Sequence, residues 1–208
     1  MGTGSGTATS SGSVVVKSVD AGSNGASGSL AFSSGAASSG SSGAIRFNTG
    51  NANVLGRSGD IAITGGAATG NTGGDVVFSS GSSTDQTGGF VSLSTSKGTA
   101  TSSGAFIVAS VNAGTAGVSG YMTFKTGTTS AGTSGEMTLE TGKATAGKGG
   151  HIVLSVGSGN TLGGGDISVT AGETTADTAQ AGSVVVTGGA GTSGTAGQGG
   201  HLSYTGGA

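Results

Sequence analysis

The chain has 208 residues, of which 49 are glycine and 8% are charged, and it contains no proline, cysteine or tryptophan. Its net charge of −2, from seven basic and nine acidic residues, provides no positively charged surface for nucleic acid or for an anionic membrane. No apolar stretch approaches the roughly 18 residues that span a bilayer, so the sequence predicts no membrane insertion.

A short repeat organises the chain from its twelfth residue onward. Each repeat opens on a glycine, and successive opening glycines are about 15 residues apart. The opening glycines are Gly12, Gly28, Gly43, Gly59, Gly74, Gly89, Gly104, Gly120, Gly135, Gly150, Gly165, Gly182 and Gly200. Self-similarity at a fixed interval is typical of solenoids and related repeat architectures.

Two apolar residues occupy the same positions in every repeat. They are the second and fourth residues after the opening glycine, and we call them the apolar row. Its members are Val14, Val16, Leu30, Phe32, Ile45, Phe47, Ile61, Ile63, Val76, Phe78, Val91, Leu93, Phe106, Val108, Met122, Phe124, Met137, Leu139, Ile152, Leu154, Ile167, Val169, Val184, Val186, Leu202 and Tyr204. Alternation with a period of two predicts a strand whose apolar side faces inward.

The second half of each repeat consists of small residues. A glycine stands seven places after the opening one in most repeats, as at Gly66 and Gly81, and predicts a tight turn with positive φ. Alanines then recur at the ninth and eleventh places, as at Ala100 and Ala131. We expect these alanines to face inward from a second strand, opposite the apolar row.

These patterns together predict an all-β fold, a single-chain parallel β-solenoid with about 15 residues per coil, about 13 coils and a flattened cross-section of two sheets. Successive coils would stack at about 4.7–4.9 Å. Residues 1–11 would form a partial first coil, and residues 12–208 one solenoid domain. The segment would be a window from a longer array, or a protein whose open ends stack on one another.

The tenth place of the repeat carries small polar residues, which we call the polar row. Its clearest members are Thr69, Thr84, Thr99, Thr115, Ser130, Thr145, Asn160, Thr175 and Thr192. Alternation predicts that they face outward as a file on a flat sheet face, where they could bind ice or another ordered surface. The alternative is that threonine and serine are present because they favour strands and turns.

The sequence gives little support for a calcium-binding, phosphate-binding, metal-binding or catalytic site. The G-G-x-G-x-D pattern of calcium-binding rolls is absent, and so is the G-x-x-x-x-G-K-[ST] phosphate-binding pattern. Glu136, His151 and Asp166 would lie on consecutive coils, but a metal site needs three or four convergent ligands, and exposed polar residues on a strand face explain these three better. We therefore predict no catalytic, cofactor-binding or metal-binding residues, no cofactor, and no enzyme activity.

The repeat frame G-x-φ-x-φ-x-[ST]-G, where φ is apolar, is seen in SGEMTLETG (Ser134 to Gly142) and, with glycine at the [ST] place, in SGDIAITGG (Ser58 to Gly66). The chain thereby resembles the Gly/Ser/Thr-rich β-solenoid arrays of microbial and algal surface proteins, adhesins and fibres. It has a weaker resemblance to ice-binding solenoids, which carry two threonine ranks where this chain has one.

The first resemblance implies a non-enzymatic structural rod, a segment of an extracellular filament, matrix or adhesive fibre. The second implies an ice-binding protein that uses the polar row. The partners expected are neighbouring copies, end to end or face to face, or an ordered surface such as ice. The expected location is extracellular or on the cell surface, although the segment shows no secretory signal.

Overall fold

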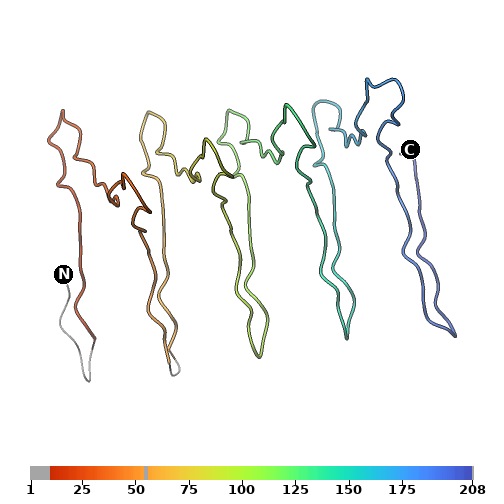
Figure 1. The fold of residues 1–208 in the computed structure, drawn as a ribbon, viewed down its shortest axis with the longest axis horizontal. Coiled ribbons are helices and arrows are strands. Elements are labelled where there is room, and N and C mark those ends of the chain that lie inside the picture. The colour runs from red at the N-terminus through yellow and green to blue at the C-terminus, as the bar shows by residue number, and fades with distance from the viewer. Residues whose placement is uncertain (1–9, 54–55, 208) are drawn as a thin grey trace. The chain divides into compact units, whose positions relative to one another are not determined.

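The computed structural model describes residues 10–53 and 56–207, and these contain no helix and no strand. The chain divides into two units, Met1–Ile107 and Val108–Ala208, each of which is described by itself. Within each unit, extended segments alternate with loops (Figure 1). Each extended segment covers the first half of a repeat, and each loop covers the second half.

The predicted all-β solenoid is wrong. A solenoid requires backbone hydrogen bonds between equivalent residues of successive coils, which would pair the neighbourhood of Gly74 with that of Gly89. Among the described residues, the backbone hydrogen bond that spans most sequence joins the Gly200 N–H to the Gly189 carbonyl, which is less than one repeat. The described residues therefore contain no ladder between repeats and no two-sheet cross-section.

The loops explain why a second strand does not form. In five repeats the opening glycine donates its N–H to the carbonyl of the seventh residue of the preceding repeat, at 2.8 to 3.2 Å. These bonds join Gly74 to Gly66, Gly89 to Gly81, Gly104 to Ser96, Gly182 to Gly172, and Gly200 to Gly189. The second half of the repeat is thus closed on itself, and its backbone does not extend beside the next repeat.

In repeats with and without a closing bond, the opening glycine approaches the sixth residue of the preceding repeat, and we call this approach the neck of the loop. A Cβ added at Gly150 would lie 3.4 Å from the Cβ of Thr141, and one at Gly165 would lie 3.0 Å from Cγ1 of Val156. The Thr141 hydroxyl also donates to the Gly150 carbonyl at 3.3 Å. A side chain at the opening glycine would therefore crowd the neck, more tightly at Gly165 than at Gly150.

Most of the loops contain a tight bend or turn near their middle in the residues that the structure describes. The bends cover residues 38–40, 69–71, 84–86, 99–101, 115–117, 130–132, 145–147 and 160–162, and shorter turns lie at 23–24, 177–178 and 194–196. Positive φ occurs within these bends, as at Gly40 (101°) and Gly70 (81°). The predicted positive φ at seventh-place glycines such as Gly66 is wrong, because those glycines form the ends of the loops.

Eleventh-place alanines expected in a second strand lie in the bends, and ninth-place alanines such as Ala68 and Ala144 directly precede them. Ala100, Ala131 and Ala146 each occupy the middle of a bend and are exposed. A bend places successive residues on a curve, so a period of two cannot direct them toward a common layer. The prediction that these alanines pack against the apolar row is therefore wrong.

Variation in repeat length is confined to the loops. The closing bond joins places seven and fifteen in the repeats that begin at Gly59, Gly74 and Gly89. In the longer repeats from Gly165 and Gly182 the same bond again starts from the seventh place, at Gly172 and Gly189, and the loop it closes is longer. The extended segment before each of these loops keeps its length.

Replacing Gly98 by alanine should open the loop between Ser96 and Gly104. A Cβ at Gly98 would lie 2.5 Å from the Ser102 carbonyl oxygen, so the backbone must shift. Because one hydrogen bond contributes about 0.5–1.5 kcal/mol net, exchange of the Gly104 amide should accelerate about two- to tenfold. Hydrogen exchange followed by NMR measures this rate.

Gly81→Ala provides the control, because a Cβ there meets no atom within 4 Å. Exchange of the Gly89 amide, which closes that loop, should change less than twofold, within the usual range for surface substitutions. Equal acceleration in both variants would contradict the steric explanation.

Candidate functional surface

The apolar row is the most regular feature of the surface. No described residue is buried, and apart from Tyr204 the members of the apolar row expose 46–73% of their surface. Apolar residues at the first and third places of the repeat, such as Phe90, Tyr121 and Val153, expose 76–92%. The extended segments therefore keep an alternation of sides, but the prediction that the apolar row is enclosed within the chain is wrong.

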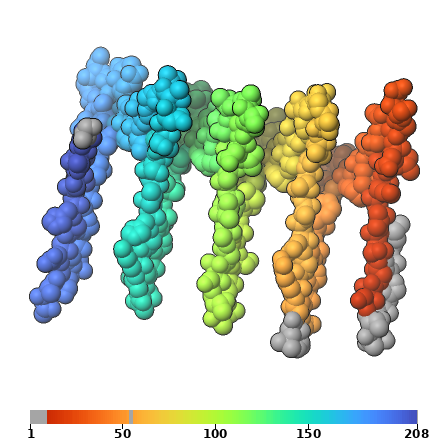
Figure 2. Space-filling model, turned by 180° about the vertical axis from the view of Figure 1, so that it is seen from behind, coloured from red at the N-terminus to blue at the C-terminus, as the bar shows by residue number. Residues whose placement is uncertain are grey.

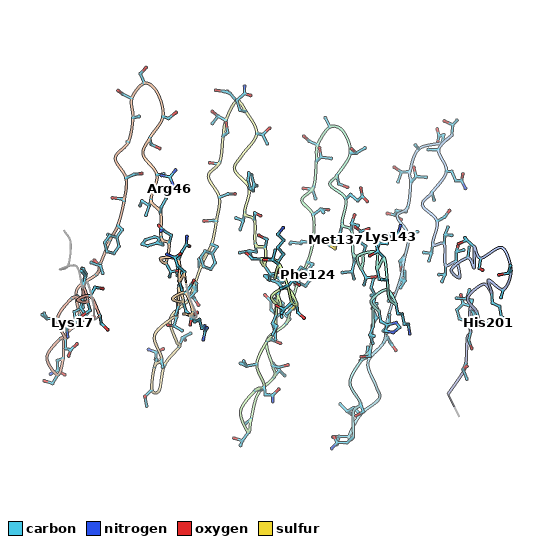
Figure 3. All side chains as sticks on the ribbon, turned by 90° about the horizontal axis from the view of Figure 1, so that it is seen from below. Lys17, Arg46, Phe124, Met137, Lys143 and His201 are labelled. Carbon is cyan, nitrogen blue, oxygen red and sulfur yellow. The ribbon has the colours of Figure 1, made fainter. Side chains whose placement is uncertain are left out.

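The apolar row forms a shallow hollow where two consecutive repeats meet in the second unit. The hollow has a volume of about 270 Å³. It is lined by Phe124 of one repeat and by Met137, Thr138 and Leu139 of the following repeat. Phe124 and Met137 lie near each other in the side-chain view (Figure 3). Members of the apolar row from these two repeats thus border one open apolar hollow, which the chain leaves accessible.

The space-filling view shows the extended segments as narrow arms (Figure 2). No member of the apolar row is buried. A side chain on such an arm is shielded only by its immediate neighbours. This accounts for exposures near one half at the second place of the repeat, as at Val76 and Ile152.

The polar row lies in the loops. Seven of its members begin a bend: Thr69, Thr84, Thr99, Thr115, Ser130, Thr145 and Asn160. Thr175 and Thr192 precede the turns at 177–178 and 194–196. All nine are exposed, but the sheet face on which they were predicted to stand is absent from the described residues.

Short-range polar contacts hold several bends. The Gln86 N–H donates to the Ser83 hydroxyl at 3.0 Å, and the Ala176 N–H donates to the Thr174 hydroxyl at 3.2 Å. Such local bonds between side chain and backbone are the reason that serine and threonine favour turns. Ser83 and Thr174 stand at the ninth place of their repeats, directly before the polar row, so these bonds explain how the bends are held but assign no such role to the polar row itself.

The charged residues do not gather into a site. Arg57 Nη2 donates to both carboxylate oxygens of Asp60, at 3.0 and 3.1 Å, but both side chains are exposed and such a pair contributes little stability. In the described part of the chain, no three His, Asp or Glu side chains meet as metal ligands would. Glu136, His151 and Asp166 therefore do not form the cluster that coil stacking would have produced.

The sixth place of the repeat is the [ST] place of the repeat frame, for which no structural role was predicted. In the structure these residues form the necks: Ser18, Ser34, Thr49, Gly65, Ser80, Thr95, Ser110, Thr126, Thr141, Val156, Ala171 and Gly188. None is larger than valine. This limit on size at one place of every repeat is the signal that could have located the neck.

In the described residues no helix is long and apolar enough to cross a membrane. The chain matches no protein-family model, no curated protein and no solved structure.

Proposed function

We propose that the chain is a non-enzymatic structural segment of an extracellular filament, matrix or adhesive fibre. The observation that supports this role most is the repetition of one exposed apolar pair along the whole chain. An active site needs a few unlike groups that converge at one place, whereas assembly needs one contact repeated many times. The repeats here differ mainly in loop length.

The composition agrees with this role. Burial of apolar surface drives most protein association, and this chain presents that surface at each of its 13 repeats. The seven basic and nine acidic residues leave few like charges to oppose contact between copies.

Electron microscopy of the purified chain tests the proposal. As concentration rises we expect elongated particles or fibres of constant width, because identical repeats favour one contact geometry. Particles that remain monomeric and irregular at every concentration would contradict it.

Ice binding by the polar row is the second candidate function. The observation that favours it is the exposure of a small hydroxyl or amide group at the same place in successive loops. Replacing both Thr99 and Thr145 with lysine should then reduce thermal hysteresis at least severalfold, because a bulky hydrated charge prevents close contact with ice.

The matched control for the ice test replaces Thr64 and Thr123, which are exposed but lie in extended segments outside the polar row. The Thr64→Lys, Thr123→Lys variant should keep the hysteresis of the parent chain. If the parent shows no hysteresis, or if both double variants lose it equally, the polar row does not bind ice.

A further inference from the structure

The chain leaves far more surface exposed than a folded protein of its mass. Its accessible surface is 20101 Å² for 18.9 kDa. Folded monomers of this mass expose about 8,300 Å², by the usual scaling of surface area with mass. A standard interface covers only roughly 800 Å² on each partner. Contact at one patch would therefore leave most of this additional accessible surface exposed to water. A partner that covers the additional surface must contact the chain along its length.

The backbone of the extended segments is also available to a partner. The backbone hydrogen bonds of the described residues close loops and turns, and none involves a member of the apolar row. An extended segment with unpaired N–H and C=O groups and alternating side chains is a template for pairing with another extended chain. The partner of such a segment should therefore also be extended, with an apolar side chain at every second residue.

The uneven spacing of the repeats restricts this partner further. The sequence numbers of successive opening glycines differ by 16, 15, 16, 15, 15, 15, 16, 15, 15, 15, 17 and 18. Because the longest repeats place their extra residues in closed loops, a strictly periodic partner would offer no loop of equal length beside them. A second copy that runs in the opposite direction would place the long repeats against short ones. A parallel copy in register matches every interval.

Charge does not oppose this arrangement. Parallel copies in register bring like charges near one another, but only 8% of the residues are charged and none of these belongs to the apolar row. From the area, the free backbone and the spacing, we infer that further copies of the same chain lie parallel and in register along it and cover the apolar row. The inference names the partner in the proposed structural role and rests on that role.

Two double variants of identical composition test the inference. Val76 and Val184 belong to the apolar row and expose 46% and 52%, whereas their neighbours Val77 and Val185 expose 79% and 81%. The Val76→Lys, Val184→Lys variant should raise the concentration needed for self-association about 100-fold or more, because each lysine enters a contact that excludes water. The Val77→Lys, Val185→Lys variant should change it less than about threefold. Analytical ultracentrifugation measures both.

Retained protection of the Gly74 and Gly182 amides would show that both variants keep their loops. Equal effects of the two variants would overturn the inference, and so would a parent chain that remains monomeric at all concentrations.

The register is tested with single cysteines, since the chain has none of its own. Ser92 and Ser168 each lie between two members of the apolar row, in distant repeats. The Ser92→Cys and Ser168→Cys chains are mixed and oxidised. In parallel copies in register each cysteine lies beside the same cysteine of another copy, so disulfides between identical chains should outnumber disulfides between the two different chains about tenfold. Mixed disulfides in equal amount would overturn the register.

These results separate the inference from the proposed function. Fibres that form equally well from both lysine variants would support the structural role and overturn the inference. In-register dimers or trimers that never extend into fibres would support the inference and contradict the role.

Discussion

A dilute solution of the chain, below the concentration at which copies associate, should show no cooperative thermal unfolding. Globular proteins absorb about 0.7 kcal/mol per residue on unfolding, which would be about 150 kcal/mol for a chain of this length. That enthalpy and its sharp transition depend on a close-packed interior, and no described residue is buried. We expect a calorimetric trace without a peak and a gradual change in circular dichroism.

Raising the concentration provides the internal control. If copies bury the apolar row, a transition should appear once they associate, and its midpoint should rise with concentration, because association stabilises the ordered state by mass action. A sharp transition in dilute solution, independent of concentration, would mean that a single chain buries a core.

Replacing Phe78 by alanine should weaken self-association more than truncating a valine of the apolar row does. Phe78 belongs to the apolar row and is 69% exposed in the isolated chain, so its removal should leave the dilute chain unchanged. In an assembled state that buries the ring, the loss should be about 3–5 kcal/mol. This corresponds to a concentration for half-association higher by about 100-fold or more, which light scattering can measure.

Phe90 supplies the matched residue for this comparison. It is also a phenylalanine, but it stands at the first place of its repeat and is 88% exposed. Phe90→Ala should shift the association midpoint less than about threefold, as exposed substitutions usually do. A larger effect at Phe90 than at Phe78 would show that the opposite side of the segment makes the contact.

Part of this fold could be predicted from the sequence. The alternation at Val76, Val77 and Phe78 is local, since an extended backbone directs successive side chains to opposite sides whatever covers them. The glycine at the seventh place likewise marked a change of chain direction after the apolar row, although the second half of the repeat was predicted to be a strand and not a loop. Both signals depend on residues that are close in sequence.

The surroundings of the apolar side of each extended segment could not be predicted in the same way. A repeat of this length fits a coil that stacks on the next coil, and it equally fits a loop that closes on its own neck. The choice depends on whether the Gly74 amide bonds to Gly66 or to an equivalent residue one repeat away, and both options use the same glycines. The polar row was misplaced for the same reason: Thr84 was assigned to a strand face because the second half of the repeat was taken to be extended.

The closed necks have a consequence for engineering. Because the longer repeats, from Gly165 and Gly182, place their extra residues inside the closed loops, the segments on either side are insulated from what the loop contains. Foreign peptides grafted at the bends near residues 84–86 or 194–196 would be displayed without altering the extended segments that flank each loop.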